Sequence, residues 1–591
     1  MGPVNALLQD ALRLHQSGER ARAAELYQQV LRTDPRNFEA LFFLGVLHGE
    51  NGRFEEAQYF TGEAAKANPQ SADAFFLRSY ALQQLGRYGE ALACLDRTLA
   101  LNPSLKQALL NRVSVQFQLR RYDEAAADCR RLLALDPDYP FVRGNLLFAR
   151  LQTCDWRELE AERRAIIAGI AAGKRVIAPF QAKALGLSPE EELRCARIWA
   201  AGQAPKLPPF WRGEIYAHEK IRVAYVSADF HAHAMANLAA GVFERHDRQK
   251  FETIAVSFGP DDGSEMRARL VRAFDRFIDM RGRTDAEIAM RIREMEIDIT
   301  IDLMGFTEGA RAAIFASRPA PVQVSYLGFP GTTGTDYMDY LIADAVVAPE
   351  AEHKYYSEKI VTLPGTFMPA DSTRSIGTQP VSRAEEGLPE DAFVFCCFNA
   401  PYKINPDIFA LWMRLLTDTQ NSILWLGQIN LSAQRSLLRE AEAQGVRSDR
   451  LVFAARRESP AEHLARLRLA DLFLDTLPYN AHATASDALW AGLPIVTCRG
   501  HSFAGRVATS MLESAGLSEL VTGSLQAYET LAMELAHAPD RLRDLKARLA
   551  QAKSSQLFDT ARHVRNLEHA YRVMWEQSRC GALPAGFTVP D

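Results

Sequence analysis

The sequence is poor in cysteine, and its few cysteines show no arrangement that supports chemistry. Eight are scattered over 591 residues, with no Cys-x-x-Cys pair and no cysteine–histidine cluster. This spacing argues against a disulfide framework and against a zinc site. The adjacent Cys396 and Cys397 have the pattern of packed strand residues rather than of a reactive pair. We therefore expect reduced thiols, no metal and no other cofactor.

Long apolar runs and an excess of one charge are also missing. No apolar run approaches the ~20 residues that span a bilayer, and the amino terminus lacks the basic and apolar segments of a signal peptide. With 68 basic and 73 acidic residues, the formal net charge of −5 favours neither a nucleic acid nor an anionic membrane as partner. We predict a globular, cytoplasmic protein of about three or four domains, because the chain is too long for one core.

The first 150 residues repeat with a period of 34. Prolines recur at Pro35, Pro69, Pro103 and Pro137, and alanines at Ala23, Ala57, Ala91 and Ala125. Aromatic residues keep the same step at Phe54, Tyr88 and Tyr122, and turn glycines at Gly18, Gly52 and Gly86. This is the tetratricopeptide period, in which each unit is a pair of helices. Residues 1–150 are predicted to form an α-solenoid of about four repeats plus a capping helix, whose concave face binds a protein partner; the alternative is a structural spacer.

Residues 151–215 are predicted to be a helical linker region. One helix is expected over residues 156–172. Another should begin after Ser188, since serine is a good N-cap and the following Pro189 suits a first turn. Prolines mark residues 203–211 as a connecting segment.

From Lys220 onward, apolar strand-like runs alternate with helical segments. In residues 216–380 we expect strands at 221–227, 253–257, 298–303 and 322–327. In residues 381–580 we expect them at 393–398, 422–426, 451–453, 471–474 and 494–497. Alternation of this kind predicts parallel sheets covered on both faces. Two Rossmann-like domains in tandem would face each other across a cleft.

The stretch from Leu477 to Thr497 is the most informative. A helix is predicted over residues 484–492, between two strands, with Gly492 as its stop. Its first turn would lie at the carboxyl edge of the sheet, where open α/β folds bind ligands. Unpaired N–H groups there suit a phosphate, and Asp487 is placed to accept hydrogen bonds from ribose. An ordinary capped helix is the alternative explanation.

Other polar residues follow the expected strands. Lys403 lies just past the strand that ends near Phe398, where an ammonium group can neutralise a departing diphosphate. His463 and Arg466 are three residues apart on one helix face and are candidates for holding a nucleotide. His233 follows the first strand. Taken singly, each of these residues could instead lie on the surface without a function.

Several phrases occur in the same order as in one enzyme family. They are Val226-Ser-Ala-Asp-Phe230 with His233, Ser257-Phe-Gly-Pro-Asp-Asp-Gly263, Arg318-Pro-Ala-Pro-Val-Gln323, Leu327-Gly-Phe-Pro-Gly-Thr-Thr-Gly334, Phe398-Asn399 with Tyr402-Lys-Ile404, Glu462-His463, Asp475-Thr476, Asn480-Ala-His482 with Asp487, and Leu489-Trp-Ala-Gly492. With the repeats, this pattern resembles the bacterial SPINDLY-like and O-GlcNAc transferase family, family 41 of the glycosyltransferases. The resemblance covers nearly the whole chain.

The resemblance implies a GT-B fold and an inverting, metal-independent transfer of a sugar, expected to be N-acetylglucosamine from UDP-N-acetylglucosamine, to serine or threonine hydroxyls of proteins selected by the repeats. It implies that His233 positions or deprotonates the acceptor hydroxyl and that Lys403 stabilises the leaving diphosphate. The implied nucleotide-sugar residues are Leu327, Gly328, Asn399, His463, Arg466, His482, Thr484 and Asp487.

The sequence departs from the family pattern at several positions. Ala483 stands where the family has a threonine, and loss of one hydrogen bond to a charged group would weaken donor binding by about tenfold to a hundredfold. Ala234 replaces a proline, and Tyr479 replaces a smaller residue near the sugar. Two repeat positions that carry asparagine in animal relatives are Phe43 and Leu77. Two alternatives therefore stay open. One is transfer of another sugar to a dedicated acceptor such as flagellin or an adhesin; the other is a scaffold with a degenerate transferase half.

Overall fold

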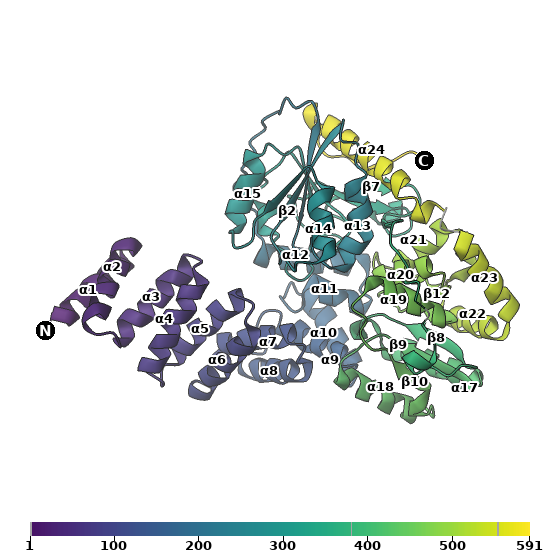
Figure 1. Ribbon diagram of the computed structural model, residues 1–591, viewed down its shortest axis with the longest axis horizontal. Helices are drawn as coiled ribbons and strands as arrows, with labels where there is room; N and C mark the ends of the chain where they lie inside the picture. The colour runs from purple at the N-terminus through teal and green to yellow at the C-terminus, as the bar shows by residue number, and fades with distance from the viewer. Residues whose placement is uncertain (1–2, 380, 552–554) are drawn as a thin grey trace. The chain divides into compact units, whose positions relative to one another are not determined.

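A computed structural model describes residues 3–379, 381–551 and 555–591 of the chain. It divides into two compact units, Met1–Arg150 and Leu151–Asp591 (Figure 1). Among the described residues, no helix combines the length and apolarity required to cross a membrane.

The first unit consists of helix pairs, as the 34-residue period predicts. The helices are α1 (Pro3–Gln16), α2 (Arg20–Thr33), α3 (Phe38–Glu50), α4 (Phe54–Ala67), α5 (Ala72–Gln84), α6 (Tyr88–Leu101), α7 (Lys106–Gln118) and α8 (Tyr122–Leu135). A ninth, α9 (Val142–Gln152), follows at the position of the expected capping helix. The second helix of each pair ends two residues before the repeated proline, which cannot continue a helix.

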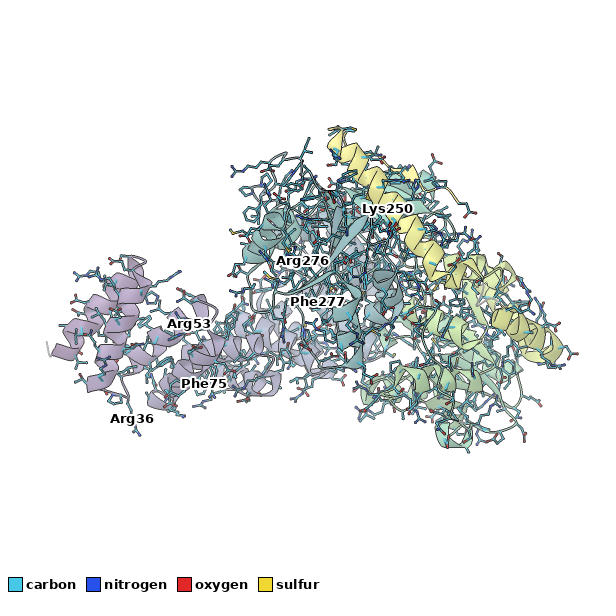
Figure 2. All side chains as sticks on the ribbon, turned by 45° about the horizontal axis from the view of Figure 1, so that its top comes forward. Arg36, Arg53, Phe75, Lys250, Arg276 and Phe277 are labelled. Carbon is cyan, nitrogen blue, oxygen red and sulfur yellow. The ribbon has the colours of Figure 1, made fainter. Side chains whose placement is uncertain are left out.

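The repeated small residues explain how each pair closes. Ala23, Ala57, Ala91 and Ala125 are buried at 0–2% exposure. The turn glycines have φ between 70° and 85°, a backbone conformation that only glycine adopts readily. In the fourth repeat Arg120 takes the same left-handed conformation with φ 56°, so the turn survives without glycine. Phe75, labelled in Figure 2, lies under the Arg97 guanidinium, whose carbon is 5.9 Å from the ring centroid.

The second unit begins with short helices and an extended segment. The helices are α10 (Leu159–Ala171), α11 (Pro179–Ala182) and α12 (Pro189–Gln203). As predicted, Ser188 caps α12, and its hydroxyl and the Glu191 carboxylate form a reciprocal capping box. The proline-rich segment after α12 donates main-chain hydrogen bonds from Leu207, Phe210 and Trp211 to residues 316–318. It is therefore fixed to the next part of the chain.

The first lobe of this unit is built on an eight-stranded sheet. Its strands are β1 (Ile221–Ser227), β2 (Phe251–Ser257), β3 (Arg276–Asp279), β4 (Ile299–Asp302), β5 (Val322–Ser325), β6 (Tyr340–Asp344), β7 (Lys359–Leu363) and β14 (Phe587–Thr588). Their order is β14-β7-β6-β5-β4-β1-β2-β3, and every neighbouring pair is parallel. The helices of this lobe are α13 (Ala234–Glu244), α14 (Glu265–Ala273), α15 (Asp285–Glu294) and α16 (Ala313–Ala316).

The second lobe is built on a six-stranded sheet, also parallel throughout. Its order is β10-β9-β8-β11-β12-β13. The strands are β8 (Phe393–Cys397), β9 (Ser422–Leu426), β10 (Leu451–Phe453), β11 (Leu472–Leu474), β12 (Ile495–Cys498) and β13 (Val521–Thr522). The helices are α17 (Pro406–Asp418), α18 (Leu431–Ala443), α19 (Pro460–Arg466), α20 (Ala483–Ala491), α21 (Val507–Ser514), α22 (Leu525–His537) and α23 (Pro539–Gln551).

The strand orders place a switch point in each sheet. In the first lobe, β1 has β2 on one side and β4 on the other. In the second lobe, β8 lies between β9 and β11 in the same way. Connections leave such a central strand toward opposite faces, which opens a crevice beyond its carboxyl end. The segments after β1, β4, β8 and β11 therefore line these crevices.

Five strands were not anticipated from the sequence: β3, β6, β7, β13 and β14. They are short, and β3, β13 and β14 are at or near sheet edges with partly exposed residues, so their apolar pattern is weak. The end of the chain also departs from the expected second domain of residues 381–580. Helix α24 (Thr560–Arg579) packs on the first lobe, where the Tyr571 hydroxyl is 3.0 Å from that of Tyr225, and β14 pairs with β7.

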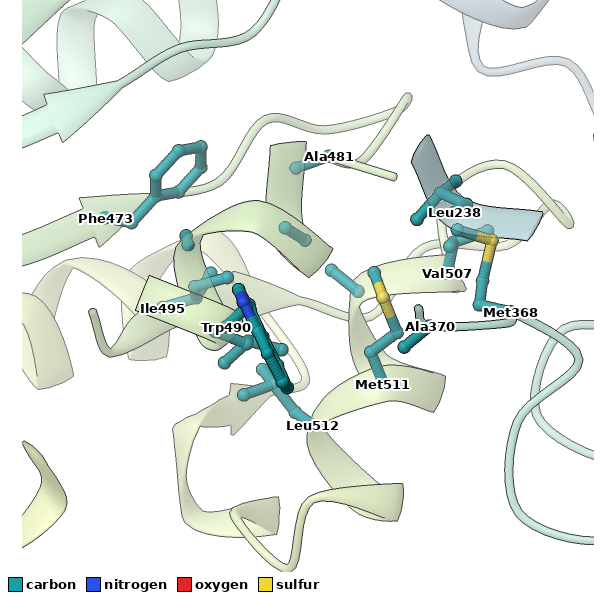
Figure 3. Close-up of a cluster of buried hydrophobic side chains, with 14 of the residues drawn as sticks. Leu238, Met368, Ala370, Phe473, Ala481, Trp490, Ile495, Val507, Met511 and Leu512 are labelled. Atoms are coloured by element: carbon teal, nitrogen blue, oxygen red, sulfur yellow. The ribbon is translucent and has the colours of Figure 1, made fainter. Parts of the chain in front are cut away.

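One apolar core runs through both lobes. Helix α13 of the first lobe contacts α20 of the second. Figure 3 shows part of this core, with Leu238 from α13, Met368 from the segment between β7 and β8, and Val507 and Met511 from α21. Phe473 and Ile495 extend the same cluster into the second sheet. The two sheets are thus joined by a shared packed interior.

Candidate active site

Lys403 occupies the switch point of the second sheet. It ends the short turn that follows β8, and only 8% of the residue is exposed. Its ammonium group donates to the carbonyl oxygen of Asn480 at 2.8 Å and lies 3.9 Å from the ring centroid of Tyr479. Burial lowers the pKa of Lys403, while the nearby Asp475 carboxylate opposes that shift. The result is a nearly dry cation with further N–H donors available to a ligand.

Asp475, immediately after β11, organises the loop around this lysine. Its Oδ1 accepts hydrogen bonds from the N–H groups of Thr476 at 2.7 Å and Ala481 at 2.6 Å. Its Oδ2 accepts from the Thr497 hydroxyl at 2.6 Å. Burial raises the pKa of this carboxyl. The sequence assigned no role to Asp475, although an acidic residue directly after a central strand was a usable signal.

Asn399 is buried and acts within this network. Its Nδ2 donates to the Thr476 hydroxyl at 2.8 Å, and its Oδ1 accepts from the Thr484 hydroxyl at 2.8 Å. The hydrogen of the Thr484 hydroxyl is therefore committed to Asn399. Of the predicted nucleotide-sugar residues, these two connect the end of β8 to the start of α20.

Helix α20 begins at the predicted place. His482 is its N-cap residue, and the first helical hydrogen bond runs from the Ser486 N–H to the His482 carbonyl. The preceding amides of Ala483, Thr484 and Ala485 have no partner within the helix, as at any helix N-terminus. Gly492 ends the helix with φ 88°. The geometry is that of an anion-binding helix start.

The imidazole of His482 has a defined protonation state. Its Nε2 is 3.1 Å from the carbonyl oxygen of Ala504, which can only accept, so Nε2 carries the proton. Burial and the Lys403 charge lower the pKa of His482 well below its ordinary value, so the ring is neutral. The Tyr479 ring is 4.9 Å away, centroid to centroid. Because Nε2 carries the proton, Nδ1 of His482 is a hydrogen-bond acceptor.

His463, Arg466 and Asp487 form a second group on α19 and α20. Arg466 is 4% exposed and donates to the Ala455 carbonyl at 2.6 Å and to Nδ1 of His463 at 3.1 Å. Because arginine only donates, the His463 proton is on Nε2, which lies 3.9 Å from Oδ2 of Asp487. Burial lowers the pKa of His463. Arg466 is thus buried and orients His463 through a hydrogen bond, rather than exposing its own charge to a ligand.

Arg374, which the sequence did not single out, joins this group. It lies in the segment that crosses between the lobes and donates to Oδ1 of Asp487 at 2.5 Å. Its side chain is 8% exposed, and its carbonyl accepts from the Trp490 indole at 3.2 Å. A loop arginine 113 residues before its partner has no sequence signal that distinguishes it.

His233 is at the switch point of the first sheet, as the N-cap residue of α13. Its Nδ1 accepts from the Met235 N–H at 3.3 Å, so a neutral ring carries its proton on Nε2. Burial lowers its pKa, although 44% of the side chain is exposed. Oδ2 of Asp229 is 3.5 Å from Nδ1, and burial raises the pKa of Asp229 to about 6. Asp229 is a second group that sequence reasoning did not assign.

Leu327 and Gly328 lie after β5. Leu327 has φ 68°, and the Gly328 N–H donates to the Tyr326 carbonyl at 2.8 Å, which makes a tight turn. A Cβ on Gly328 would be 1.9 Å from the Leu303 carbonyl oxygen, so only glycine fits. This turn begins the loop of residues 327–334 at the edge of the crevice.

The predicted residues in the second lobe therefore form two groups, while His233 and the turn of Leu327 and Gly328 lie in the first lobe. Lys403, Asn399, His482 and Thr484 are joined through Asp475 and Tyr479, and His463, Arg466 and Asp487 adjoin them on α19 and α20. The contacts of His233 are with Asp229, His231 and Met235, all in the first lobe. The helical segment before the first sheet reaches the second lobe here, because Phe180 of α11 packs edge-on to Tyr479 and tilted against Tyr402, with ring centroids 6.3 and 6.0 Å away. Within residues 3–379, 381–551 and 555–591, no three histidine, cysteine, aspartate or glutamate side chains are grouped to hold a metal ion.

Sequence comparison identifies the second unit and part of the first. The profile of glycosyl transferase family 41 matches residues 206–378 and 374–567. A tetratricopeptide repeat profile matches residues 76–140, and one for the anaphase-promoting complex, cyclosome, subunit 3, matches residues 17–98. The repeats and the two sheets therefore correspond to the architecture expected from the sequence.

Curated relatives carry related names. The chain is 37% identical over 432 residues to the probable UDP-N-acetylglucosamine–peptide N-acetylglucosaminyltransferase SEC of Arabidopsis thaliana. This alignment covers 70% of this chain and 44% of the plant protein. It is 28% identical to the corresponding Caenorhabditis elegans transferase, over 61% of this chain and 41% of that one. The chain thus spans less than half the length of these relatives.

A solved structure matches along the whole chain. It is a variant of the O-GlcNAc transferase of Thermobaculum terrenum, 27% identical, with a TM-score of 0.64 and 98% of both chains covered. Its agreement with the two parallel sheets described above establishes the GT-B fold. The chain belongs to glycosyl transferase family 41 and is similar along its length to that O-GlcNAc transferase.

Proposed function

We propose that this chain transfers N-acetylglucosamine from UDP-N-acetylglucosamine to serine or threonine hydroxyls of proteins, with inversion at the sugar carbon. The observation that carries the proposal is the buried Lys403 ammonium beside the open start of α20, at the switch point of the second sheet. The names of the Arabidopsis and nematode relatives support the donor and the peptide acceptor.

The diphosphate is the group that this arrangement suits best. Lys403 supplies a full positive charge in a site of low dielectric, where it acts more strongly than in water. The first amides of α20 supply main-chain donors and the positive end of the helix dipole. Because these amides do not depend on side chains, Ala483 removes only one hydroxyl from the phosphate site. Together they stabilise charge on the leaving diphosphate, and we propose that no metal is required.

The sugar and the nucleoside are held on either side. Nδ1 of His482 is free to accept a hydrogen bond from a sugar hydroxyl, whereas it cannot donate to a phosphate in its neutral form. At the nucleoside end, Oδ2 of Asp487 faces Nε2 of His463 at 3.9 Å, leaving that oxygen for a ribose hydroxyl. Arg374 and Arg466 hold these two side chains in place.

The acceptor enters from the first lobe in this proposal. Its hydroxyl oxygen forms a bond to the sugar carbon as the bond from that carbon to the diphosphate oxygen breaks, on the opposite face, which inverts the configuration. In its present tautomer, Nε2–H of His233 donates to the acceptor oxygen and orients it. With its proton on Nδ1 instead, facing Oδ2 of Asp229 at 3.5 Å, His233 presents a free Nε2 that takes the hydroxyl proton as the new bond forms, and the Asp229 carboxylate stabilises the resulting imidazolium. The first unit would select the protein that carries this hydroxyl.

A second candidate keeps the fold and changes the donor sugar. Tyr479 is 5% exposed and lies between Lys403 and His482, so its bulk limits the space beside the proposed sugar. A nucleotide sugar without the N-acetyl group would suit a narrower site. The acceptor would then be a dedicated partner.

Donor screening separates these possibilities. The full chain is incubated with UDP-N-acetylglucosamine, UDP-glucose, UDP-galactose and GDP-fucose, and nucleotide release is measured with and without a lysate as acceptor source. Release of UDP from UDP-N-acetylglucosamine, together with a mass gain of about 203 Da on an acceptor, equal to one N-acetylhexosamine, supports the first proposal. Turnover of another sugar alone supports the second. Absence of both turnover and UDP binding by calorimetry would favour a scaffold.

A further inference from the structure

A buried ion pair lies outside both sheets, in the helical segment that precedes them. Lys183 is 3% exposed, and its ammonium group donates to Oε2 of Glu192 at 2.7 Å. The Glu192 side chain is 10% exposed. Burial raises the pKa of Glu192, while the Lys183 charge opposes that shift. Neither residue has a role in the site described so far.

On one side, Lys183 holds the loop of residues 327–334 in the first lobe. Its ammonium group lies 5.0 Å from the centroid of the Phe329 ring. At Gly331, with φ 150°, an added Cβ would lie 2.4 Å from Nζ of Lys183, so the lysine rests directly on the backbone of this loop. This is the loop that begins with the tight turn at Leu327 and Gly328.

On the other side, the same segment rests on the donor loop of the second lobe. A Cβ on Gly186 would lie 3.2 Å from Pro478, and Phe180 packs edge-on to Tyr479. Tyr479 is the residue over which Lys403 lies and which contacts His482. The segment that carries Lys183 therefore contacts the 327–334 loop of the first lobe and the loop containing Pro478 and Tyr479 of the second lobe.

A second ion pair completes the arrangement. Arg506 of the second lobe donates through two nitrogens to Glu352 of the first lobe, at 2.7 and 2.6 Å. Helix α12, which carries Glu192, contacts the turn of residues 350–355, which carries Glu352, so the two pairs lie on adjoining elements. The Arg506 Nε donates to the Gly500 carbonyl at 3.0 Å. Gly500 lies in the same loop as Ala504, whose carbonyl oxygen accepts the hydrogen bond from Nε2 of His482.

Stability alone does not explain a buried pair in this place. A buried ion pair contributes little net stability relative to well-packed neutral residues of similar volume, whereas removal of one partner strands a charge. What Lys183 and Glu192 provide is a fixed geometry between two loops from different lobes. Displacement of a reacting group by about 1 Å is sufficient to reduce a rate by about a hundredfold.

We propose that Lys183 and Glu192 are positioning residues of the active site, which fix the 327–334 loop against the Leu477-to-His482 loop so that sugar and leaving group are aligned. This proposal rests on the proposed function for its kinetic consequence. Its structural content, a clamped 327–334 loop, stands independently of the donor.

The test removes both charges together. In the variant K183M/E192Q no charge is stranded, so the fold is retained. The matched control is K206M/D336N, which removes an exposed pair (2.9 Å) that also joins this segment to the first lobe. For each variant, amide hydrogen exchange of residues 327–334, calorimetric affinity for UDP, melting temperature and kcat with UDP-N-acetylglucosamine are measured.

We expect K183M/E192Q to melt like the wild type and to bind UDP within about twofold, while kcat falls by about tenfold to a hundredfold. Exchange in residues 327–334 should accelerate by at least about tenfold, and the control should match the wild type throughout. Wild-type exchange in this loop would overturn the proposal whatever the activity. A wild-type chain that turns over no UDP-N-acetylglucosamine would refute the proposed function, while the exchange measurement would still decide this one.

Discussion

Replacement of Lys403 by methionine is the sharpest perturbation of the proposed chemistry. Methionine keeps most of the side-chain volume over the Tyr479 ring but removes the charge and the hydrogen bond to the Asn480 carbonyl. Loss of one preorganised group that stabilises charge in the transition state reduces kcat by about 10²–10³-fold, or ~2.7–4 kcal/mol. Because Lys403 acts on charge that develops as the diphosphate leaves, affinity for intact UDP-N-acetylglucosamine should fall much less than kcat, whereas UDP, which carries that charge, should bind more weakly.

The pH profile provides an independent check. Burial lowers the pKa of Lys403, so its ammonium form is lost at a lower pH than that of an ordinary lysine. The wild type should therefore lose kcat on the alkaline side as pH rises through that lowered pKa. The methionine variant, which has no proton to lose at this position, should lack this alkaline decrease.

The assay is nucleotide release from UDP-N-acetylglucosamine, with the affinities for UDP-N-acetylglucosamine and UDP and the melting temperature measured on the same preparations. Lys546→Met is the matched control, since Lys546 contacts the Ala470 carbonyl at the opposite, amino end of β11. The control should keep wild-type kcat. Equal rates for Lys403→Met and the wild type, with both folded, would refute the proposed role of the lysine.

Three further changes test the remaining groups. Asp229→Asn should abolish the fall in kcat/KM that the wild type shows as pH drops through about 6, because protonation of this carboxyl removes the charge that stabilises the His233 imidazolium; an unchanged acid limb in rate profiles would exclude this role. Arg374→Met should weaken UDP binding by about tenfold in calorimetry, since Asp487 loses its charged partner, and wild-type affinity would contradict the ribose-binding role. Ala483→Thr adds a hydroxyl at the start of α20 and should strengthen UDP binding by up to about tenfold; weaker binding would mean that the site has no room for it.

The local pattern of the sequence determined much of this protein. The 34-residue period fixed the helix pairs, because the proline, alanine and turn positions act within one repeat. Runs such as Ile221–Ser227 and Ser422–Leu426 were recognisable as strands because both faces of a parallel sheet are buried. The start of α20 was also readable, since capping and helix-stop residues act within a few positions. Lys403 could be proposed because it follows a strand, and Thr484 and Asp487 because they lie in the first turns of that helix.

Only the tertiary structure decided how those residues are held. Asp475 accepts hydrogen bonds from residues up to 76 positions away, and Arg374 is bonded to Asp487 across 113 positions. The final helix and strand return to the first lobe, whereas the sequence analysis assigned residues 381–580 to the second domain. Burial and partner geometry, not sequence, set the neutral state of His482 and the raised pKa of Asp229. Local sequence preferences specify each helix and strand. The electrostatic environment and the contacts at a site depend instead on atoms that the fold brings together from distant segments.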